Sequence, residues 1–199
     1  SSVGDALKIA AVAQRVVDAR AAGNQIAVVV SAMGKTTDQL IALAQSVTST
    51  PEPRELDLLL STGEIVSSTL MAMALREIGV PSISLGGAQA GIRTDMIHGA
   101  ASIVHLDPAR IRRELDGGKV VIVAGFQGIT DDLDITTLGR GGSDTTAVAL
   151  AAALQADRCE VYTDVDGIYT ADPRVVPSAR KLAEIGYQDM LELASYGAK

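Results

Sequence analysis

Two short, uninterrupted apolar runs constrain the fold of this chain more than any other feature. They occupy residues 26–30 (Ile-Ala-Val-Val-Val) and 120–124 (Val-Val-Ile-Val-Ala), and each follows a turn signal. Strands that are apolar on both faces are typical of parallel sheets covered by helices on both sides. With one Phe, four Tyr and no Trp among 199 residues, Ala, Val, Ile and Leu must fill the interior.

Helical periodicity and turn residues place helices between these strands. The sequence predicts helices over 9–22, 37–47, 54–78, 108–115, 143–154 and 187–195. It predicts further strands over 83–85 and 159–162, a β-hairpin or irregular loop over 86–103, and a long loop over 125–142. Because strands and helices alternate without a dividing linker, we expect one α/β sandwich with a mainly parallel sheet over residues 1–199.

Charge and cysteine content exclude several classes of protein. The chain has 17 Lys and Arg against 24 Asp and Glu, a net charge of −7, and no Lys/Arg block, which argues against nucleic acid and anionic membranes as partners. Cys159 is the one cysteine, so no internal disulfide can form, and a reducing, cytoplasmic setting is expected. No uninterrupted apolar run approaches the ~18 residues of a membrane span, and no signal-peptide pattern opens the chain.

A glycine-rich string joins a loop to a strong helix start. Residues 139–146 read Gly-Arg-Gly-Gly-Ser-Asp-Thr-Thr, with Ser143 or Asp144 predicted as the helix cap. Free amide groups at such a helix start favour an anion, and the planar fork of Arg140 suits a carboxylate or phosphate. A flexible turn with an ordinary cap explains the same string. The polar loops at 31–37, 62–64 and 163–174 favour a shared ligand crevice instead.

Four other patterns carry no clear signal. Gly34-Lys35-Thr36 lacks the earlier glycine of a P-loop, because that position holds Val29. The run 164–167 (Asp-Val-Asp-Gly) does not keep the register of a calcium loop, and His98 and His105 have no shared metal spacing. Glu64 follows Gly63 within an apolar helix, and a solvated helix face explains it as well as a ligand role does.

Several strings, in this order along the chain, resemble the aspartate kinases of the amino acid kinase superfamily. They are 30–32, 60–64, 137–144 (Thr-Leu-Gly-Arg-Gly-Gly-Ser-Asp), 162–169 (Tyr-Thr-Asp-Val-Asp-Gly-Ile-Tyr), 172–174 and 196–199. The resemblance implies a three-layer α/β/α sandwich with a mainly parallel central sheet. It also implies ATP with Mg²⁺ and L-aspartate as reactants, 4-phospho-L-aspartate as product, and a place at the first step of the pathway to lysine, threonine and methionine.

The resemblance also implies roles for individual residues. The positions that resemble the amino-acid-binding ones are Ser31, Thr37, Glu64 and Arg140. Of these, Arg140 would meet a substrate carboxylate and Glu64 its ammonium. Ser143 and Asp144 match the catalytic loop near the transferred phosphoryl group. The positions that match the nucleotide site are Thr163, Asp164, Tyr169, Arg174 and Lys199. A homo- or hetero-oligomer is implied for the full-length protein.

The chain departs from the family pattern at both ends. Family members begin with a strand and Lys-Phe-Gly-Gly-Thr-Ser-Val-Gly, of which only Ser2-Val3-Gly4 is present, and the chain stops at Lys199 before the closing strands and any regulatory ACT domains. We therefore expect an incomplete catalytic domain that lacks the phosphate-bridging lysine and shows no turnover by itself. Another superfamily kinase, or a nucleotide- or amino-acid-binding module without turnover, stays open.

Overall fold

The two apolar runs become hydrogen-bonded neighbours. Strand β1 (Ala27–Val30) pairs in parallel with β5 (Val120–Ala124), with Ala27 opposite Val121. Strand β2 (Ser82–Leu85) pairs in parallel with the other edge of β5, which gives sheet A the order β1-β5-β2. The central strand is therefore the last of the three in the sequence, and all five of its residues are buried.

The computed structural model describes residues 4–163 and 167–195. The chain divides into two compact units, Ser1–Tyr162 (unit 1) and Thr163–Lys199 (unit 2), and each is described by itself. A single catalytic domain over residues 1–199 stays a prediction.

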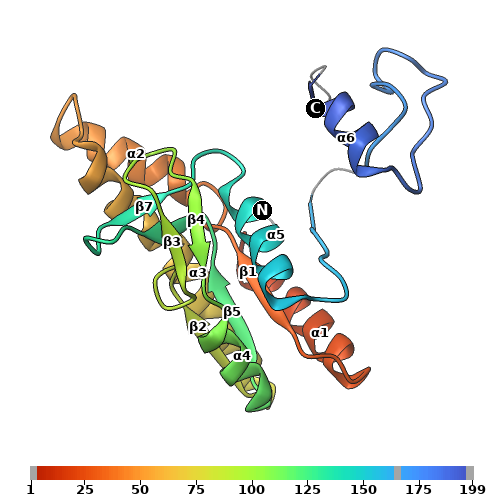
Figure 1. Ribbon diagram of the computed structural model, residues 1–199, viewed down its shortest axis with the longest axis horizontal. Coiled ribbons are helices and arrows are strands. Elements are labelled where there is room, and N and C mark those ends of the chain that lie inside the picture. Colours follow the sequence, from red (N-terminus) through yellow and green to blue (C-terminus); the bar gives the residue numbers. More distant parts are fainter. Residues whose placement is uncertain (1–3, 164–166, 196–199) are drawn as a thin grey trace. The chain divides into compact units, whose positions relative to one another are not determined.

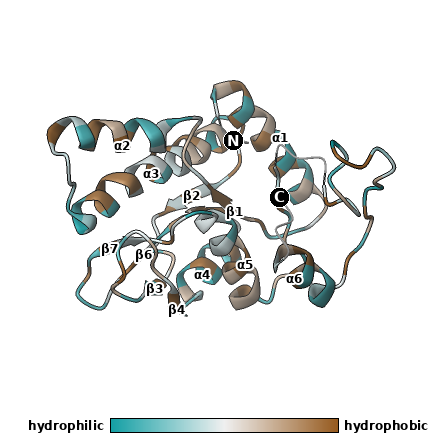
Figure 2. Cartoon of the chain, turned by 90° about the horizontal axis from the view of Figure 1, so that it is seen from above, coloured by the Kyte–Doolittle hydropathy of each residue, from teal (hydrophilic) through white to brown (hydrophobic). Residues whose placement is uncertain are grey.

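Helices cover both faces of sheet A in unit 1 (Figures 1 and 2). Helices α1 (Ala6–Ala21) and α3 (Pro53–Glu77) pack with Val120 and Ile122 in one core. Helices α4 (Ala109–Asp116) and α5 (Gly142–Leu154) pack with Val121 and Val123 in the other. Successive strand residues point to opposite faces, so β5 supplies both cores and the three layers follow from its apolar run.

A second sheet lies beside α3 and was only partly predicted. Sheet B has the order β4-β3-β6-β7 and consists of β3 (Ile92–Thr94), β4 (Ile103–Leu106), β6 (Gln127–Ile129) and β7 (Ile135–Thr137). The antiparallel β3–β4 pair agrees with the hairpin alternative for 86–103. The prediction of one long loop over 125–142 is wrong, because β6 and β7 form a hairpin there whose strands are too short to show a period.

Residues 159–162 form no strand, contrary to the prediction. They are exposed and have no strand pairing in the part of the chain that the structure describes. Alternation alone was misleading at this position, because a strand also needs a hydrogen-bonded partner. The remaining helices agree with the predicted ranges: α2 (Thr36–Val47) packs on α3, and α6 (Tyr187–Ser195) lies in unit 2.

Helix α3 is long and apolar enough, by length and average composition, to cross a membrane. Half of its most apolar stretch is buried within the fold, as in a core helix of a folded domain. The same helix buries the carboxyl side chains of Asp57 and Glu64, which are 1% and 3% exposed. Both take part in the polar structure described below.

Candidate functional site

A cavity of about 290 Å³ opens where β1 and β5 end in unit 1. Its size is near the lower end of small-molecule sites, which span ~300–1,000 Å³. It brings together all six predicted substrate-binding and catalytic residues, although they come from three separate parts of the sequence. The lining residues are Ser31, Thr37, Glu64, Phe126, Gly139, Arg140, Gly141, Gly142, Ser143 and Asp144.

Gly63 explains how Glu64 reaches the cavity. A Cβ atom at Gly63 would lie 3.0 Å from the Cβ of Ala32, so glycine lets the loop after β1 approach α3 this closely without displacing Ala32. The Ala32 amide then donates a hydrogen bond of 2.9 Å to Glu64 Oε1. The solvated-face explanation of Glu64 is wrong, because its side chain is turned into the protein and is 3% exposed.

The carboxyl group of Glu64 has a raised pKa and one oxygen without a partner among the described residues. Burial raises the pKa of its carboxyl group from 4.5 to about 7, and the Ala32 amide offsets part of this rise. The second oxygen, Oε2, is buried and has no hydrogen-bond partner among the described residues. Buried polar atoms are rarely left unpaired, so this oxygen marks a position where a ligand cation or donor would be stabilised.

The N-terminus of α5 forms the opposite wall of the cavity. Its cap is Gly141, with φ of 76° and no side-chain hydrogen bond, so the prediction of Ser143 or Asp144 as cap is wrong. The left-handed backbone at Gly141 brings Ser143 and Asp144 into the first helical turn. Their amide groups have no partner within the described part of the chain, and the helix dipole makes this end favourable for an anion.

Arg140 lies on the loop between two left-handed glycines, Gly139 and Gly141. Its side chain is exposed and makes no hydrogen bond or ion pair with any described residue. The guanidinium is therefore free to bind a carboxylate or phosphate in the cavity through two parallel hydrogen bonds.

Phe126 is a lining residue that the sequence analysis missed. It lies two residues after the end of β5 and has φ of 68°, an uncommon conformation for a bulky residue. Its amide donates to Thr146 Oγ1 at 3.2 Å, and a Cβ at Gly125 would approach Ser143 Oγ to 2.8 Å. The sequence signal that could have identified it was the one Phe of the chain, two residues after a buried strand. The tight packing at Gly125 and Phe126 seats the start of α5 against the end of β5.

The predicted nucleotide residues belong to unit 2. Thr163 is exposed, and Tyr169 forms an isolated antiparallel bridge with Lys181. Arg174 donates to both carboxylate oxygens of Asp172, at 3.0 and 2.7 Å, and this pairing raises the pKa of Arg174. Asp164 and Lys199 lie outside the described residues.

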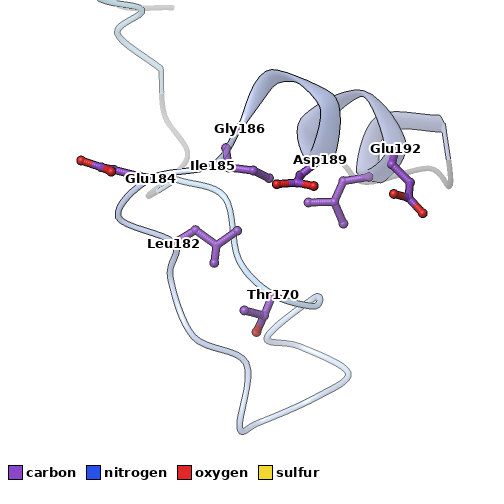
Figure 3. A pocket seen from close by; sticks show the side chains of 8 residues that line it. Thr170, Leu182, Glu184, Ile185, Gly186, Asp189 and Glu192 are labelled. Atoms are coloured by element: carbon purple, nitrogen blue, oxygen red, sulfur yellow. The ribbon is translucent and has the colours of Figure 1, made fainter.

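Unit 2 has a cavity of its own, of about 730 Å³ (Figure 3). None of Thr163, Tyr169 and Arg174 lines it. Its polar lining includes three carboxylates, which would repel a triphosphate. These are Glu184, Asp189 and Glu192. This cavity is therefore a poor candidate for the nucleotide site.

Comparison with known proteins finds that this chain is similar to curated aspartokinases. The aspartokinase of Geobacillus stearothermophilus is 59% identical over 198 residues, which are 100% of this chain and 49% of that protein. Aspartokinase 2 of Bacillus subtilis is 57% identical over 198 residues, again 100% of this chain and 48% of that protein. The chain thus spans about half the length of these curated relatives.

Solved structures give the same result and confirm the predicted fold class. The aspartate kinase of Synechocystis superposes with a TM-score of 0.86 at 56% identity, covering 100% of this chain and 32% of that one. E. coli aspartokinase III, in complex with aspartate and ADP, also gives 0.86, at 29% identity, covering 99% and 55%. Residues 1–199 match the amino acid kinase family throughout. The chain therefore belongs to the amino acid kinase family.

Proposed function

We propose that the unit 1 cavity binds L-aspartate, and that the protein transfers the γ-phosphoryl group of ATP to the side-chain carboxylate, giving 4-phospho-L-aspartate and ADP. The observation that carries this proposal is the convergence of Glu64, Arg140 and the α5 N-terminus on one small cavity. The names of the relatives support it, as does the aspartate and ADP complex of E. coli aspartokinase III.

The charges around the cavity match those of the amino acid. Arg140 would hold one substrate carboxylate through its planar fork, and the unpartnered oxygen of Glu64 would accept a hydrogen bond from the ammonium. The half-buried hydroxyl groups of Ser31 and Thr37 lie on the same cavity and would complete the contacts to the amino acid. The second carboxylate is then left as the phosphoryl acceptor.

The reaction needs positioning and charge compensation rather than a general base. An aspartate side chain, with an ordinary pKa of ~3.9, is already ionised at neutral pH and attacks phosphorus directly. The bond between the γ-phosphorus and the bridging oxygen breaks as the acyl phosphate forms, and ADP leaves. The α5 amides and Ser143 would offset negative charge near the transferred group, and Asp144 would organise the neighbouring cations.

Mg²⁺ would reach the site with ATP. The described residues contain no group of three or more His, Cys, Asp or Glu side chains that could hold a metal ion. The cavity residues fit a Mg²⁺ ion that arrives with the nucleotide, because such an ion keeps several waters and is bound largely by phosphate oxygens. When bound, the ion would neutralise charge on the phosphates. We assign the nucleotide to Thr163, Asp164, Tyr169, Arg174 and Lys199 on the resemblance stated above.

The wider setting follows from the same proposal. We propose a cytoplasmic enzyme, an oligomer in its full-length form, at the first step toward lysine, threonine and methionine. The names of the curated aspartokinases support the activity on which this setting rests.

Replacing Arg140 by Lys tests the substrate assignment. In the full-length protein, Arg140→Lys is expected to raise the aspartate KM at least ~10-fold, about 1.4 kcal/mol, because lysine cannot form two parallel hydrogen bonds. The ATP KM should change much less. Steady-state kinetics with each substrate varied in turn measures both values.

Arg112→Lys is the matched control, since Arg112 is exposed on α4 and its side chain bonds only to the Ala153 carbonyl among the described groups. It should leave both KM values near wild type. An unchanged aspartate KM in Arg140→Lys would contradict the role of Arg140.

A further inference from the structure

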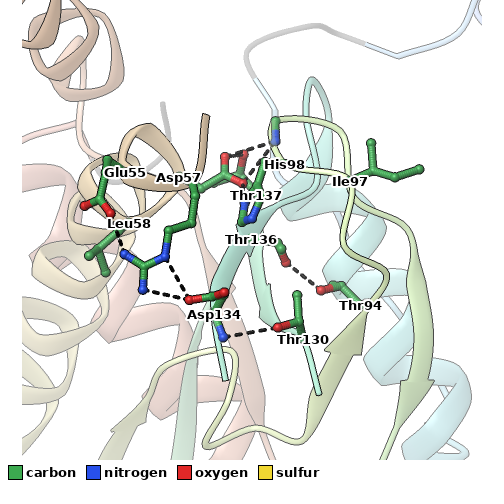
Figure 4. A network of polar contacts seen from close by, with 12 residues as sticks. Glu55, Asp57, Leu58, Thr94, Ile97, His98, Thr130, Asp134, Thr136 and Thr137 are labelled. Carbon is green, nitrogen blue, oxygen red and sulfur yellow. Dashed lines mark hydrogen bonds and ion pairs between the residues drawn. The ribbon is translucent and has the colours of Figure 1, made fainter. Parts of the chain in front are cut away.

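A buried carboxylate outside the cavity is connected to the loop that carries Arg140. Asp57, on α3, is 1% exposed and does not line the cavity. It accepts hydrogen bonds from the Gly99 amide at 3.0 and 3.1 Å, from His98 Nδ1 at 2.8 Å and from the Thr137 hydroxyl at 2.5 Å (Figure 4). Three donor groups from two separate segments thus converge on one side chain.

Both segments touch the start of the Arg140 loop. Thr137 ends β7, three residues before Arg140, and its carbonyl accepts from the Ala101 amide at 2.9 Å. A Cβ at Gly139 would lie 3.2 Å from the Gly99 carbonyl oxygen, so residues 99 and 139 are packed backbone to backbone. Gly139 is therefore held between two groups that Asp57 fixes.

The loop itself contains few interactions that could hold it. The Gly142 amide donates to the Gly139 carbonyl at 3.0 Å, and the Leu138 amide donates to the Phe126 carbonyl at 2.8 Å. The Arg140 side chain has no partner among the described residues. On its C-terminal side the loop is held by α5, where the Thr145 amide donates to the Gly141 carbonyl at 3.0 Å. On its N-terminal side the position of Arg140 depends on where the backbone of Gly139 is anchored, and that anchor ends at Asp57.

We propose that Asp57 is a positioning residue for substrate binding: through Thr137 and the His98–Gly99 turn it sets the place from which Arg140 reaches the cavity. The substrate part of this inference rests on the proposed function. The anchoring part concerns the backbone alone and can be measured without turnover.

The test compares the same Asp→Asn substitution at two of the points where α3 is bonded to the β6–β7 hairpin. Asp57→Asn keeps the size of the side chain but offers one acceptor oxygen to three donors. Asp134→Asn is the matched control, because Asp134 pairs with Arg54 of α3 at 2.7 Å (Figure 4) and does not line the cavity. Thr137→Val, with Thr137→Ser as its conservative partner, removes one arm of the anchor if Asp57→Asn folds poorly.

In the full-length protein, Asp57→Asn is expected to raise the aspartate KM at least ~10-fold with the ATP KM within ~2-fold. Hydrogen exchange at the Ala101, Leu138 and Gly142 amides should accelerate about 10-fold or more, because the anchor of these bonds is lost. Thr137→Val should show a smaller change in the same direction, and Thr137→Ser and Asp134→Asn none at these amides.

Unchanged exchange at these amides in Asp57→Asn would overturn the anchor, as would an equal rise of the aspartate KM in Asp134→Asn. Faster exchange without a change in the aspartate KM would overturn the link to Arg140. A wild-type protein that phosphorylates no aspartate would refute the proposed function instead, while the exchange comparison would still decide the anchor.

Discussion

An Asp144→Asn variant of the full-length protein is expected to lose about 10²-fold in kcat and to keep its melting temperature within a few degrees. Asp144 lines the cavity from the first turn of α5, and the cap of that helix is Gly141. The substitution therefore removes a charge from the site without removing a cap. Only the small interaction of the charge with the helix dipole, about 0.3–1 kcal/mol, is lost from stability. Steady-state kinetics and thermal melting measure the two effects.

Asp38→Asn is the control for this variant, because Asp38 is also an exposed carboxylate in the first turn of a helix, α2, and does not line the cavity. Both variants should melt alike, and only Asp144→Asn should lose activity. If Asp144→Asn retains full kcat, the carboxylate has no part in phosphoryl transfer.

Glu64→Gln is expected to weaken aspartate binding and to change how the free energy of unfolding depends on pH. We expect the aspartate KM to rise about 10²-fold, because removing one partner of a buried charge pair costs about 2–5 kcal/mol. In wild type, aspartate binding should also strengthen as pH rises toward 8, because the pKa of Glu64 is raised to about 7 and only its ionised form attracts an ammonium. This pH dependence of the aspartate KM should be absent in Glu64→Gln.

The stability of the free protein should change in the opposite sense. Folded Glu64 holds its proton to about pH 7, whereas the unfolded side chain releases it near 4.5. The free energy of unfolding of wild type should therefore fall, relative to Glu64→Gln, by about 3 kcal/mol as pH rises through this interval. Urea unfolding of both proteins at pH 5 and pH 8.5, without ligand, measures the difference.

Glu114 provides the contrasting control. Lys119, Arg113 and Arg110 lower the pKa of its carboxyl group, mainly through the hydrogen bond from Lys119. Its contribution to stability is present at neutral pH and is lost as pH falls, so Glu114→Gln should differ from wild type least in acid. A wild-type protein whose stability relative to Glu64→Gln is the same at pH 5 and pH 8.5 would contradict the burial and the raised pKa of Glu64.

Local pattern predicted the elements of unit 1 that depend on their own residues. The run 120–124 is β5 to the residue, and α2 begins one residue before the predicted start at 37. The hairpin β6–β7 escaped prediction because its short strands are held by distant groups on α3, Arg54 and Asp57. Contacts with a helix eighty residues away cannot be predicted from the local sequence of a three-residue strand.

The sequence predicted which residues lie at the candidate site, but it did not predict the burial of Glu64 or the cap of α5. The loops and the family resemblance named Arg140, Ser143 and Asp144, and these do lie on one cavity. The burial of Glu64 could not be read from the sequence, because it depends on the approach of Ala32 to Gly63 across the fold. The cap was mispredicted for a related reason: glycine at the cap leaves the helix start open, and sequence preference favours a side chain there.

The position of β5 in the middle of sheet A has a consequence for synthesis on the ribosome. In that sheet β1 and β2 bond to β5 and never to each other, so neither strand has its partner until residue 124 has been made. At ~5–20 residues per second, β1 waits on the order of 5–20 s after its own translation. During that interval two strand segments without hydrogen-bonded partners are exposed on the nascent chain. We expect a chaperone to bind there.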